Sequence, residues 1–257
     1  MTYQSISYDL SDGVAVITLN RPTVMNALTS QLRREMLHAV GRAEREARVL
    51  VLTGAGRAFC SGQDLADVDI ATVDLEAALR DEYEPLLTAI ASCPVPVIAA
   101  VNGAAAGAGA GLALACDVVI AAESASFIQA FTRIGLVPDA GGSYWLPRQV
   151  GLARAMGAML FAEKVSARQA ADWGMIWEAV PDDAFAAHWR TRAQTLASGP
   201  AAAYRGVKQA LRASFDNDFA AQLALEARLQ GACGKSPDFL EGVAAFLEKR
   251  PARFGSR

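Results

Sequence analysis

The chain has 257 residues, enough for one large hydrophobic core, and no linker or block of like charge divides it. Its formal net charge of -3 argues against a nucleic-acid-binding surface. Residues 1–10 have neither the charged nor the apolar region of a signal peptide, and the longest apolar stretch, 103–122, is interrupted by Asp117. We therefore expect one soluble, cytoplasmic domain that binds neither nucleic acid nor membrane.

The four cysteines lie far apart in the sequence and form no C-x-x-C pair. This spacing is typical of reduced thiols in or near a core rather than of disulfides or a zinc site. We expect no metal site, and we expect free thiols at Cys60, Cys93, Cys116 and Cys233.

Hydrophobic periodicity in the first half of the chain predicts alternating strands and helices. In chain order these are strands at 3–10 and 14–20 joined as a hairpin, a helix at 29–47, a strand at 49–52, a helix at 75–91 and a strand at 97–101. The small residues 102–112 lead into a helix expected to end near Asp117, and a strand follows at 118–121. Thr29 is predicted to cap the first helix. Segment 55–69 has no periodicity, so we predict a loop there, or a loop that enters a short helix.

The second half of the chain is predicted to be mostly helical. Its helices are expected at 153–161, 166–173, 183–197, 201–213, 219–231 and 238–249, with one strand at 176–180. Strands that alternate with helices, followed by a helical final third, indicate an α/β core with a helical annex.

The stretch Gly135–Arg148 contains the acid that we expect to carry proton transfer. Asp139 stands between Pro138 and a turn of small residues, with Tyr144 and Trp145 beyond it. A carboxylate on a tight loop beside an apolar surface can have its pKa tuned for acid/base work. Taken alone, the same residues fit an ordinary structural turn better than a catalytic loop.

Two glycine-containing stretches, 59–65 and 103–111, have a backbone that another group can approach closely. A strand followed by glycines and then a helix leaves backbone N–H groups unpaired at the start of the helix. These N–H groups can form an oxyanion hole or a phosphate cradle. Tight packing of a helix on a sheet is the equally good alternative. Neither G-x-G-x-x-G nor a P-loop occurs, which disfavours a dinucleotide or ATP site.

Five motifs resemble the crotonase, or enoyl-CoA hydratase/isomerase, superfamily over nearly the whole chain. They are Asn20-Arg21-Pro22, Met25-Asn26-Ala27-Leu28, the run from Gly56 to Leu65, the run from Pro96 to Gly103, and Phe246-Leu247-Glu248-Lys249-Arg250. The resemblance implies an α/β, ClpP-like crotonase fold, a spiral of ββα units with a helical C-terminal region that forms trimers. Residues 1–198 would form the core with the acyl-CoA site, and residues 199–257 the helical region of the same unit.

The resemblance also implies an acyl-CoA thioester as substrate, with coenzyme A as part of it and no separate cofactor, and a homotrimer or a dimer of trimers. By motif position, the family's two oxyanion donors fall on the backbone N–H groups of Gln63 and Ala108. Two such donors in a dry site lower the barrier to enolate formation by about 3 to 4 kcal/mol each.

The remaining residues expected around the substrate surround these donors or hold coenzyme A. The backbone at residues 58–63 would hold coenzyme A, with Arg21 or Arg57 at its phosphates. Aromatic side chains would line the acyl pocket or serve as plain core, and residues near the C-terminus would reach the adenine, including from a neighbouring subunit. The full set is Arg21, Ala58, Cys60, Ser61, Gly62, Asp64, Leu65, Gly107, Phe131, Pro138, Tyr144, Trp145, Lys249 and Phe254.

The chain departs from the family's hydratases at both catalytic glutamates, whose positions fall at Gly111 and Phe131. Asp139, where related isomerases carry an acid, is the remaining proton carrier, and a single carboxylate suits a double-bond shift. Both histidines, His38 and His188, lie on predicted helices away from every motif, which disfavours the dehalogenase chemistry found in the family.

The stretch Val137–Arg148, with Ala153-Arg154-Ala155-Met156-Gly157 and Trp173-Gly174-Met175-Ile176-Trp177, is similar to the 1,2-epoxyphenylacetyl-CoA isomerases of phenylacetate breakdown. The resemblance implies conversion of a ring epoxide to an oxepin thioester, together with shifts of enoyl-CoA double bonds. The alternatives are a hydratase-like enzyme of fatty-acid or aromatic degradation and a non-catalytic binding protein of the same fold. The sequence leaves open the acyl group, trimer or hexamer, and whether Glu82 assists catalysis.

Overall fold

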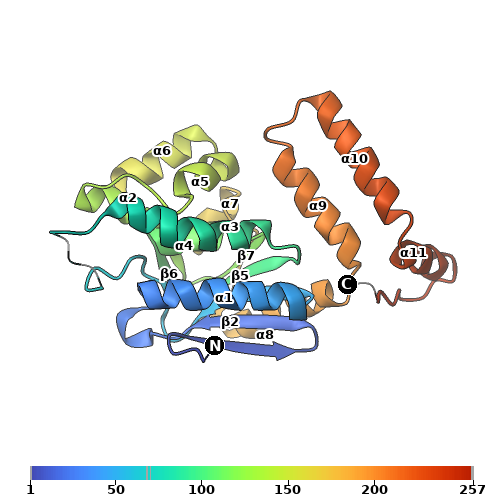
Figure 1. Cartoon of the computed structure of the whole chain (residues 1–257), viewed down its shortest axis with the longest axis horizontal. Helices are drawn as coiled ribbons and strands as arrows, with labels where there is room; N and C mark the ends of the chain where they lie inside the picture. Colours follow the sequence, from blue (N-terminus) through green and yellow to red (C-terminus); the bar gives the residue numbers. More distant parts are fainter. Residues whose placement is uncertain (1, 68, 70, 256–257) are drawn as a thin grey trace.

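Two sheets of mainly parallel strands form the centre of the computed structural model, which describes residues 2–67, 69 and 71–255. Helices surround the sheets, and the last helices of the chain project away from this core (Figure 1). The α/β core and the helical C-terminal region predicted from the sequence are both present.

The larger sheet has six strands in the order β1-β2-β3-β5-β7-β10. They are β1 (Ile6–Ser11), β2 (Val14–Leu19), β3 (Val49–Gly54), β5 (Val97–Val101), β7 (Val118–Ala122) and β10 (Glu178–Val180). The predicted hairpin is confirmed: β1 and β2 pair antiparallel around Asp12 and Gly13, which both have positive φ, as a tight hairpin turn requires. All other pairs in this sheet are parallel.

The smaller sheet has four short strands in the order β4-β6-β8-β9, and the sequence did not predict any of them. They are β4 (Ala58–Cys60), β6 (Ala104–Ala106), β8 (Ser126–Ile128) and β9 (Val165–Ser166). The expectation that 55–69 is a loop, with or without a short helix, is therefore wrong at β4. Strands of two or three residues are too short to show an alternating pattern, and β6 contains only alanine.

The helices confirm most of the predicted periodicity. They are η1 (Pro22–Val24), α1 (Ser30–Glu46), α2 (Leu75–Ala78), η2 (Leu79–Tyr83), α3 (Glu84–Ser92), α4 (Ala108–Leu114), η3 (Ala130–Ile134), α5 (Gly142–Val150), α6 (Leu152–Phe161), α7 (Ala167–Asp172), α8 (Asp182–Ala197), α9 (Ala201–Ala213), α10 (Phe219–Cys233) and α11 (Pro237–Leu247). The Thr29 hydroxyl accepts a hydrogen bond from Leu32 N at 3.2 Å, which confirms the predicted cap.

The short 3₁₀ helices η1 and η3 were not predicted, and two longer helical segments also differ from the prediction. The helix expected at 75–91 is divided into α2, the π-helical turn η2 and α3, with Pro85 in the first turn of α3. Helix α5 was not predicted, because it begins at Gly141-Gly142 and contains Pro147, and both residue types normally mark helix ends.

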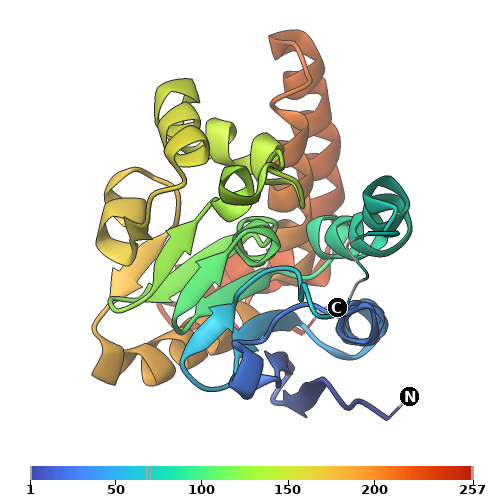
Figure 2. The ribbon, with the colours of Figure 1, turned by 90° about the vertical axis from the view of Figure 1, so that its left-hand side faces the viewer.

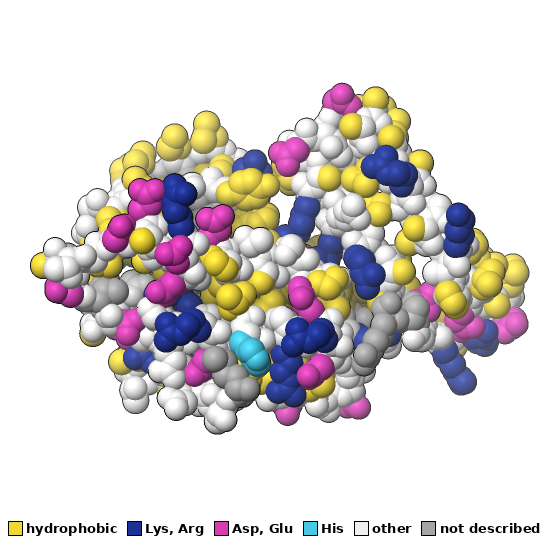
Figure 3. Space-filling model, viewed as in Figure 1, with side chains coloured by type: hydrophobic (Ala, Val, Ile, Leu, Met, Phe, Trp, Pro, Cys, Tyr) yellow, Lys and Arg dark blue, Asp and Glu magenta, His cyan; other side chains and the backbone are white. Residues whose placement is uncertain are grey.

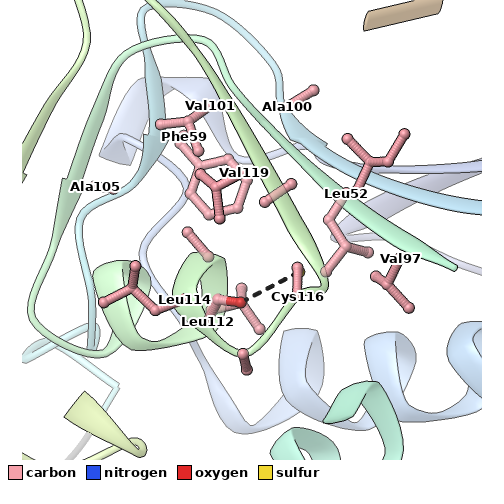
Figure 4. Close-up of a cluster of buried hydrophobic side chains, with 14 of the residues drawn as sticks. Leu52, Phe59, Val97, Ala100, Val101, Ala105, Leu112, Leu114, Cys116 and Val119 are labelled. Carbon is pink, nitrogen blue, oxygen red and sulfur yellow. Dashed lines mark hydrogen bonds between the residues drawn. The ribbon is translucent and has the colours of Figure 1, made fainter. Parts of the chain in front are cut away.

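The hydrophobic core lies between the sheets and the helices that cover them (Figure 2). Leu52, Phe59, Leu112 and Val119 come from four different elements and pack together in the cluster of Figure 4. Burying a side chain of this size stabilises the fold by about 1.5–3 kcal/mol. The core therefore fixes β4 and α4, whose ends carry the residues discussed below.

Helices α9, α10 and α11 form the projecting region (Figure 1). Asp117 attaches α9 to the core: its carboxylate accepts a hydrogen bond from Val97 N at 2.8 Å, and forms ion pairs with Lys208 at 2.5 Å and Arg212 at 2.8 Å. The Lys208 ammonium also donates to Val95 O at 2.8 Å. The two cations of α9 thus fix this helix to the start of β5.

The cysteines are free thiols, as expected, with Cys60, Cys93 and Cys116 buried. Across residues 2–67, 69 and 71–255, no group of three His, Cys, Asp or Glu side chains is arranged to hold a metal ion. Within the same residues, no helix combines the length and the apolar character needed to cross a membrane.

Candidate active site

The residues that follow β4 and β6 meet at one edge of the smaller sheet, because these two strands run parallel. Gly62 follows β4 with φ of 91°, and Gly107 follows β6 with φ of 52°. Residues with a Cβ rarely adopt such positive φ values. A Cβ on Gly62 would lie 2.8 Å from Ala106 O and 3.4 Å from Ala108 N. The two glycines therefore permit the close approach of two backbone segments.

The N–H groups of Gln63 and Ala108 follow these two glycines directly. Leu28 N donates to Gly62 O at 2.8 Å and Asp64 N donates to Leu28 O at 3.0 Å, so both neighbours of Gln63 are fixed in a parallel bridge. Among the described residues, neither Gln63 N nor Ala108 N donates a hydrogen bond. Free N–H groups on adjacent, glycine-lined segments are the arrangement that an oxyanion hole requires.

Asp139 lies on the tight turn between η3 and α5, as the sequence predicts. Ala140 and Gly141 both have positive φ, and Gly142 N donates to Asp139 O at 2.8 Å, which closes the turn. The Asp139 side chain is half-buried, and burial raises the pKa of its carboxyl group to about 6. Within the part of the chain that the structure describes, no cation pairs with this carboxylate.

Helix α4 connects the Asp139 turn to the Ala108 N–H. Ala108 begins this helix, and Gly111, three residues later, is on the same face. A Cβ on Gly111 would lie 2.4 Å from Ala140 O and 3.0 Å from Ala140 Cβ, so the turn packs directly on the glycine. Asp139 is therefore held about one helical turn from a candidate oxyanion donor.

At Gly111 and Phe131, where the family's hydratases carry their catalytic glutamates, other groups of this chain fill the space. Gly111 leaves no room for a side chain beneath the Asp139 turn. Phe131 is 7% exposed, and the position of a Cβ on Gly107 is 3.7 Å from its ring, which puts this ring beside the N–H of Ala108. Of the predicted aromatic residues, Phe131 is thus brought to the site.

A cluster of polar side chains lies behind Gln63, and the sequence did not reveal it. The Arg33 guanidinium is 2% exposed and donates to Gln63 Oε1 at 2.7 Å, to the Tyr83 hydroxyl at 3.1 Å and to Leu28 O at 3.1 Å. Tyr83 OH donates to the same Gln63 oxygen at 2.5 Å. Glu82 pairs with Arg33 at 2.5 Å.

Charge in this cluster is balanced. Burial acts to raise the pKa of Glu82, but hydrogen bonds from Arg33 and Ser30 hold that pKa below its usual value. Burial raises the pKa of Tyr83, the Arg33 charge partly offsets the rise, and the Asp139 charge adds to it. The Tyr83 hydroxyl is therefore protonated at neutral pH and lies within electrostatic range of Asp139.

Two further residues of the N-terminal motifs hold the same loop. Arg21 Nη1 donates to Ala27 O at 2.6 Å and pairs with Asp64 at 2.7 Å. The fully buried Asn26 amide donates to the carbonyls of Ala55, Ala58 and Phe59 at 2.9, 2.8 and 3.2 Å. The predicted CoA-binding residues Arg21 and Asp64 thus pair with each other.

The other residues expected near the thioester lie on the same stretch. Ala58, Cys60 and Gly62 are buried, Ser61 and Pro138 are half-buried, and Leu65 is exposed. Burial raises the pKa of Cys60 to about 12, so this thiol stays protonated and is no nucleophile at neutral pH.

Tyr144 and Trp145 lie on α5, and their rings meet edge to face with centroids 4.7 Å apart. Both line a cavity of about 720 Å³ between the core and α9, together with Leu211 and Phe215. Asp139, Gln63 and Ala108 are not among the residues that line this cavity.

Lys249 and Phe254 follow α11, and in Figure 1 this last segment runs back toward the start of α9, apart from α5 and the Asp139 turn that precedes α5. Phe254 packs against Gly242, and Lys249 is exposed. Within one chain these residues are therefore separated from the site.

Both histidines have structural partners outside the site. His38 Nδ1 lies 2.8 Å from the Tyr3 hydroxyl, and His188 Nε2 lies 2.7 Å from Glu178. The sequence-based interpretation of both as ordinary helix side chains agrees with these positions.

Residues 9–257 match the family model described as enoyl-CoA hydratase/isomerase. A protein of Rhodobacter capsulatus described as a probable enoyl-CoA hydratase is 65% identical over 257 residues, with 100% of both chains covered. The 1,2-epoxyphenylacetyl-CoA isomerase of Escherichia coli is 45% identical, covering 94% of this chain and 95% of its own.

Solved structures are equally similar in fold. An enoyl-CoA hydratase structure from Geobacillus kaustophilus has a TM-score of 0.93 at 33% identity, covering 99% of both chains. The enoyl-CoA hydratase from Bacillus anthracis has a TM-score of 0.91 at 34% identity, covering 98% of this chain and 99% of its own. These likenesses confirm the crotonase fold expected from the sequence motifs.

Proposed function

Because this chain belongs to the enoyl-CoA hydratase/isomerase family, we propose that it is an acyl-CoA isomerase in which Asp139 is the single acid/base. The observation that carries this proposal is the position of Asp139: its carboxylate has a pKa raised to about 6 and its turn packs on α4 beside the free N–H of Ala108. A general base with a pKa near 6 is ionised at neutral pH yet basic enough to accept a proton.

The proposed reaction is a proton transfer along an acyl chain. Asp139 removes a proton from the carbon next to the thioester carbonyl, or from the carbon two positions further along, and the thioester oxygen becomes negatively charged. The N–H groups of Gln63 and Ala108 hold that oxygen. Asp139 then returns the proton two carbons away, so that the double bond moves and the enzyme ends unchanged.

Hydration of enoyl-CoA is the second candidate, since the relative from Rhodobacter capsulatus is described as a probable enoyl-CoA hydratase. The packing around Gly111 argues against it. A glutamate at this position, which would activate water, would collide with Ala140 O, and Phe131 occupies the position of the other glutamate. Asp139 would have to perform both roles alone.

For the acyl group we propose a 3-enoyl thioester or an aromatic ring epoxide. The Escherichia coli relative at 45% identity is named as a 1,2-epoxyphenylacetyl-CoA isomerase, which supports the epoxide. The ring of Phe131 beside Gly107 supplies an apolar surface next to the proposed thioester site. Coenzyme A would lie along residues 58–63, with Arg21 or Arg57 near its phosphates.

We also propose that the chain assembles as a homotrimer or a dimer of trimers. Phe219, Phe246 and Leu247 are 78%, 82% and 73% exposed on the projecting helices. Figure 3 shows hydrophobic side chains gathered over this region. A second copy of the chain would cover them, and would bring Lys249 and Phe254 close to a neighbouring site. Mass measurement by light scattering after size-exclusion chromatography distinguishes monomer, trimer and hexamer.

The central experiment compares wild type and Asp139→Asn on a 3-enoyl-CoA, crotonyl-CoA and the epoxide thioester. We expect wild type to isomerise at least one of the first and third substrates, and Asp139→Asn to lose about 10²–10⁴-fold in kcat while still binding acyl-CoA. Unchanged turnover in the variant would overturn the assignment of Asp139. Water addition to crotonyl-CoA as the main activity would favour the hydratase, and no turnover of any substrate would favour a binding protein.

A further inference from the structure

We propose that Arg33 is a positioning residue that orients the Gln63 N–H for the thioester oxygen, with Glu82 balancing its charge and Tyr83 holding the Gln63 side chain. This inference rests on the proposed function, since it concerns one of the two donors of the proposed oxyanion hole. It also gives Glu82, which the sequence left open as a catalytic assistant, a role through Arg33.

Hydrogen bonds on both sides of the Gln63 backbone support this role. Arg33 Nη1 donates to Gln63 Oε1 at 2.7 Å and to Leu28 O at 3.1 Å. Leu28 O also accepts from Asp64 N at 3.0 Å, and Leu28 N donates to Gly62 O. One guanidinium nitrogen therefore contacts both the side chain of Gln63 and Leu28, the residue that forms a β-bridge with the Gln63 backbone.

Tyr83 and Gln63 complete the arrangement. The Tyr83 hydroxyl accepts from Arg33 at 3.1 Å and donates to Gln63 Oε1 at 2.5 Å, so Gln63 Oε1 receives two donors. The Gln63 amide Nε2 donates to Asp64 O at 3.0 Å. With its oxygen and its nitrogen both engaged, the Gln63 side chain is fixed in one rotamer.

The burial of Arg33 argues for a specific purpose. A buried guanidinium costs several kcal/mol of desolvation unless its donors are satisfied, so buried ion pairs contribute little net stability. Arg33 is 2% exposed, and its acceptors include Ser30 of α1, Glu82 of η2 and Leu28, which forms the bridge with Gln63. These contacts join α1, η2 and the Leu28 bridge at Gln63, one of the two residues proposed as oxyanion donors.

The position of an oxyanion donor matters because its contribution depends on alignment with the developing charge. Loss of one donor in known enzymes reduces kcat about 10²–10³-fold. A donor that is present but poorly aligned should lose part of this factor. Binding of the ground-state substrate, which relies on the remaining contacts, should change far less.

The test measures two quantities, the polarisation of the thioester carbonyl and the rate of isomerisation. Saturated butyryl-CoA with a ¹³C-labelled thioester carbonyl reports polarisation of its C=O bond by infrared difference spectroscopy without needing turnover. We expect Arg33→Met to reduce the wild-type carbonyl shift by about half or more, and kcat about 10–100-fold, with KM changed by no more than about 3-fold. Arg33→Lys, which keeps a donor, should recover part of both.

Tyr83→Phe keeps the proposal testable if Arg33→Met does not fold, because it deletes one hydroxyl from the cluster. We expect a smaller loss of carbonyl shift, with kcat reduced about 3–10-fold. In a background of Gln63→Leu, Tyr83→Phe should have little further effect, since both variants remove the same hydrogen bond. Arg42→Met is the matched control: Arg42 is on the same helix and pairs with Glu46 at the surface.

The outcomes separate the inference from the proposed function. A wild-type carbonyl shift that Arg33→Met and Tyr83→Phe leave unchanged overturns the positioning role alone. Absence of any shift in wild-type protein overturns the oxyanion hole, and the inference with it. Equal losses in Arg42→Met and Arg33→Met would assign the effect to α1 stability and overturn the specific role of Arg33.

Discussion

Gly111 of α4 and the carbonyl oxygen of Ala140 lie so close together that a Cβ at position 111 would be 2.4 Å from that oxygen. Because Gly111 has no side chain, the turn that contains Asp139 and Ala140 can pack directly on α4, the helix that begins at Ala108. The absence of a side chain at Gly111 both removes one possible acid and makes space for another.

Gly111→Ala should therefore lower activity by displacing the Asp139 turn. The new methyl group must push Ala140 away, and a displacement of about 1 Å at a reacting group can cost about 10²-fold in rate. Overpacking should also lower the free energy of unfolding by about 1–3 kcal/mol. Isomerase kinetics and urea denaturation measure the two effects.

The matched control for this change is Gly157→Ala in α6, where the added Cβ would meet no described atom within 4 Å beyond its chain neighbours and the adjacent backbone of its own helix. Replacement of a helical glycine by alanine in open space should leave kcat unchanged and add about 0.5–1 kcal/mol of stability. Wild-type turnover in Gly111→Ala would show that the position of the Asp139 turn does not limit the reaction.

The raised pKa of Asp139 predicts the pH dependence of the reaction. The proposed base must be ionised in the free enzyme, so kcat/KM should be low at acid pH and should rise to a plateau as pH increases through about 6. The measurement is kcat/KM for a 3-enoyl-CoA from pH 5 to pH 8. A rate that falls over this range would indicate that the protonated carboxyl group acts first.

The long elements could be predicted from sequence, because their periodic patterns coincide with their packing. Helix α1 is the clearest case, since its apolar residues face the core and Thr29 caps it as expected. The short strands β4 and β6 could not, since three residues carry no periodic signal and their pairing depends on partners distant in sequence. Pro147 concealed α5 for a different reason, since a proline inside a pattern normally ends a helix.

The same contrast divides the candidate site. Asp139 and its turn could be found from local residue types, and the family motifs identified Gln63 and Ala108. Arg33 could not be found in this way, because a charge on a helix surface and a charge within the core look alike until the partner is known. Its one signal was its spacing of three residues before Met36 and seven before Val40, which puts it on the apolar face of α1.

Asp117→Ala should loosen the projecting helices. This change removes the acceptor of Lys208, Arg212 and Val97 N together, and leaves two poorly hydrated cations beside the core. We expect a loss of about 2–4 kcal/mol in the free energy of unfolding and faster amide exchange in α9. Hydrogen exchange followed by mass spectrometry resolves this helix from the rest of the chain.

The control for Asp117 is Glu123→Ala, which breaks the ion pair with Arg168 at the surface. An exposed pair contributes about 0–1 kcal/mol, so stability and exchange in α9 should stay near wild type. Similar effects of the two variants would mean that the attachment of α9 depends on other contacts.

Asp139→Asn should stabilise the protein while it abolishes isomerisation. The pKa of Asp139 is about 6 in the folded chain and about 4 when unfolded, so folding favours the protonated carboxyl group. Below pH 4 the Asp139 carboxyl group of the wild type is protonated and does not destabilise the fold. As pH rises from about 4 through 6, its ionisation lowers the free energy of unfolding. An amide cannot ionise and escapes this cost at every pH.

The advantage of Asp139→Asn should accordingly be near zero at pH 4 and reach about 1–3 kcal/mol above pH 7. Urea denaturation of both proteins at pH 4, 5, 6 and 8 measures the difference, with Asp216→Asn, a change at an exposed aspartate, as the control. A difference that is constant with pH would mean that the Asp139 carboxyl group is not destabilised by burial. A difference that grows above pH 4 would show that the fold gives up stability to keep a base of suitable strength beside α4.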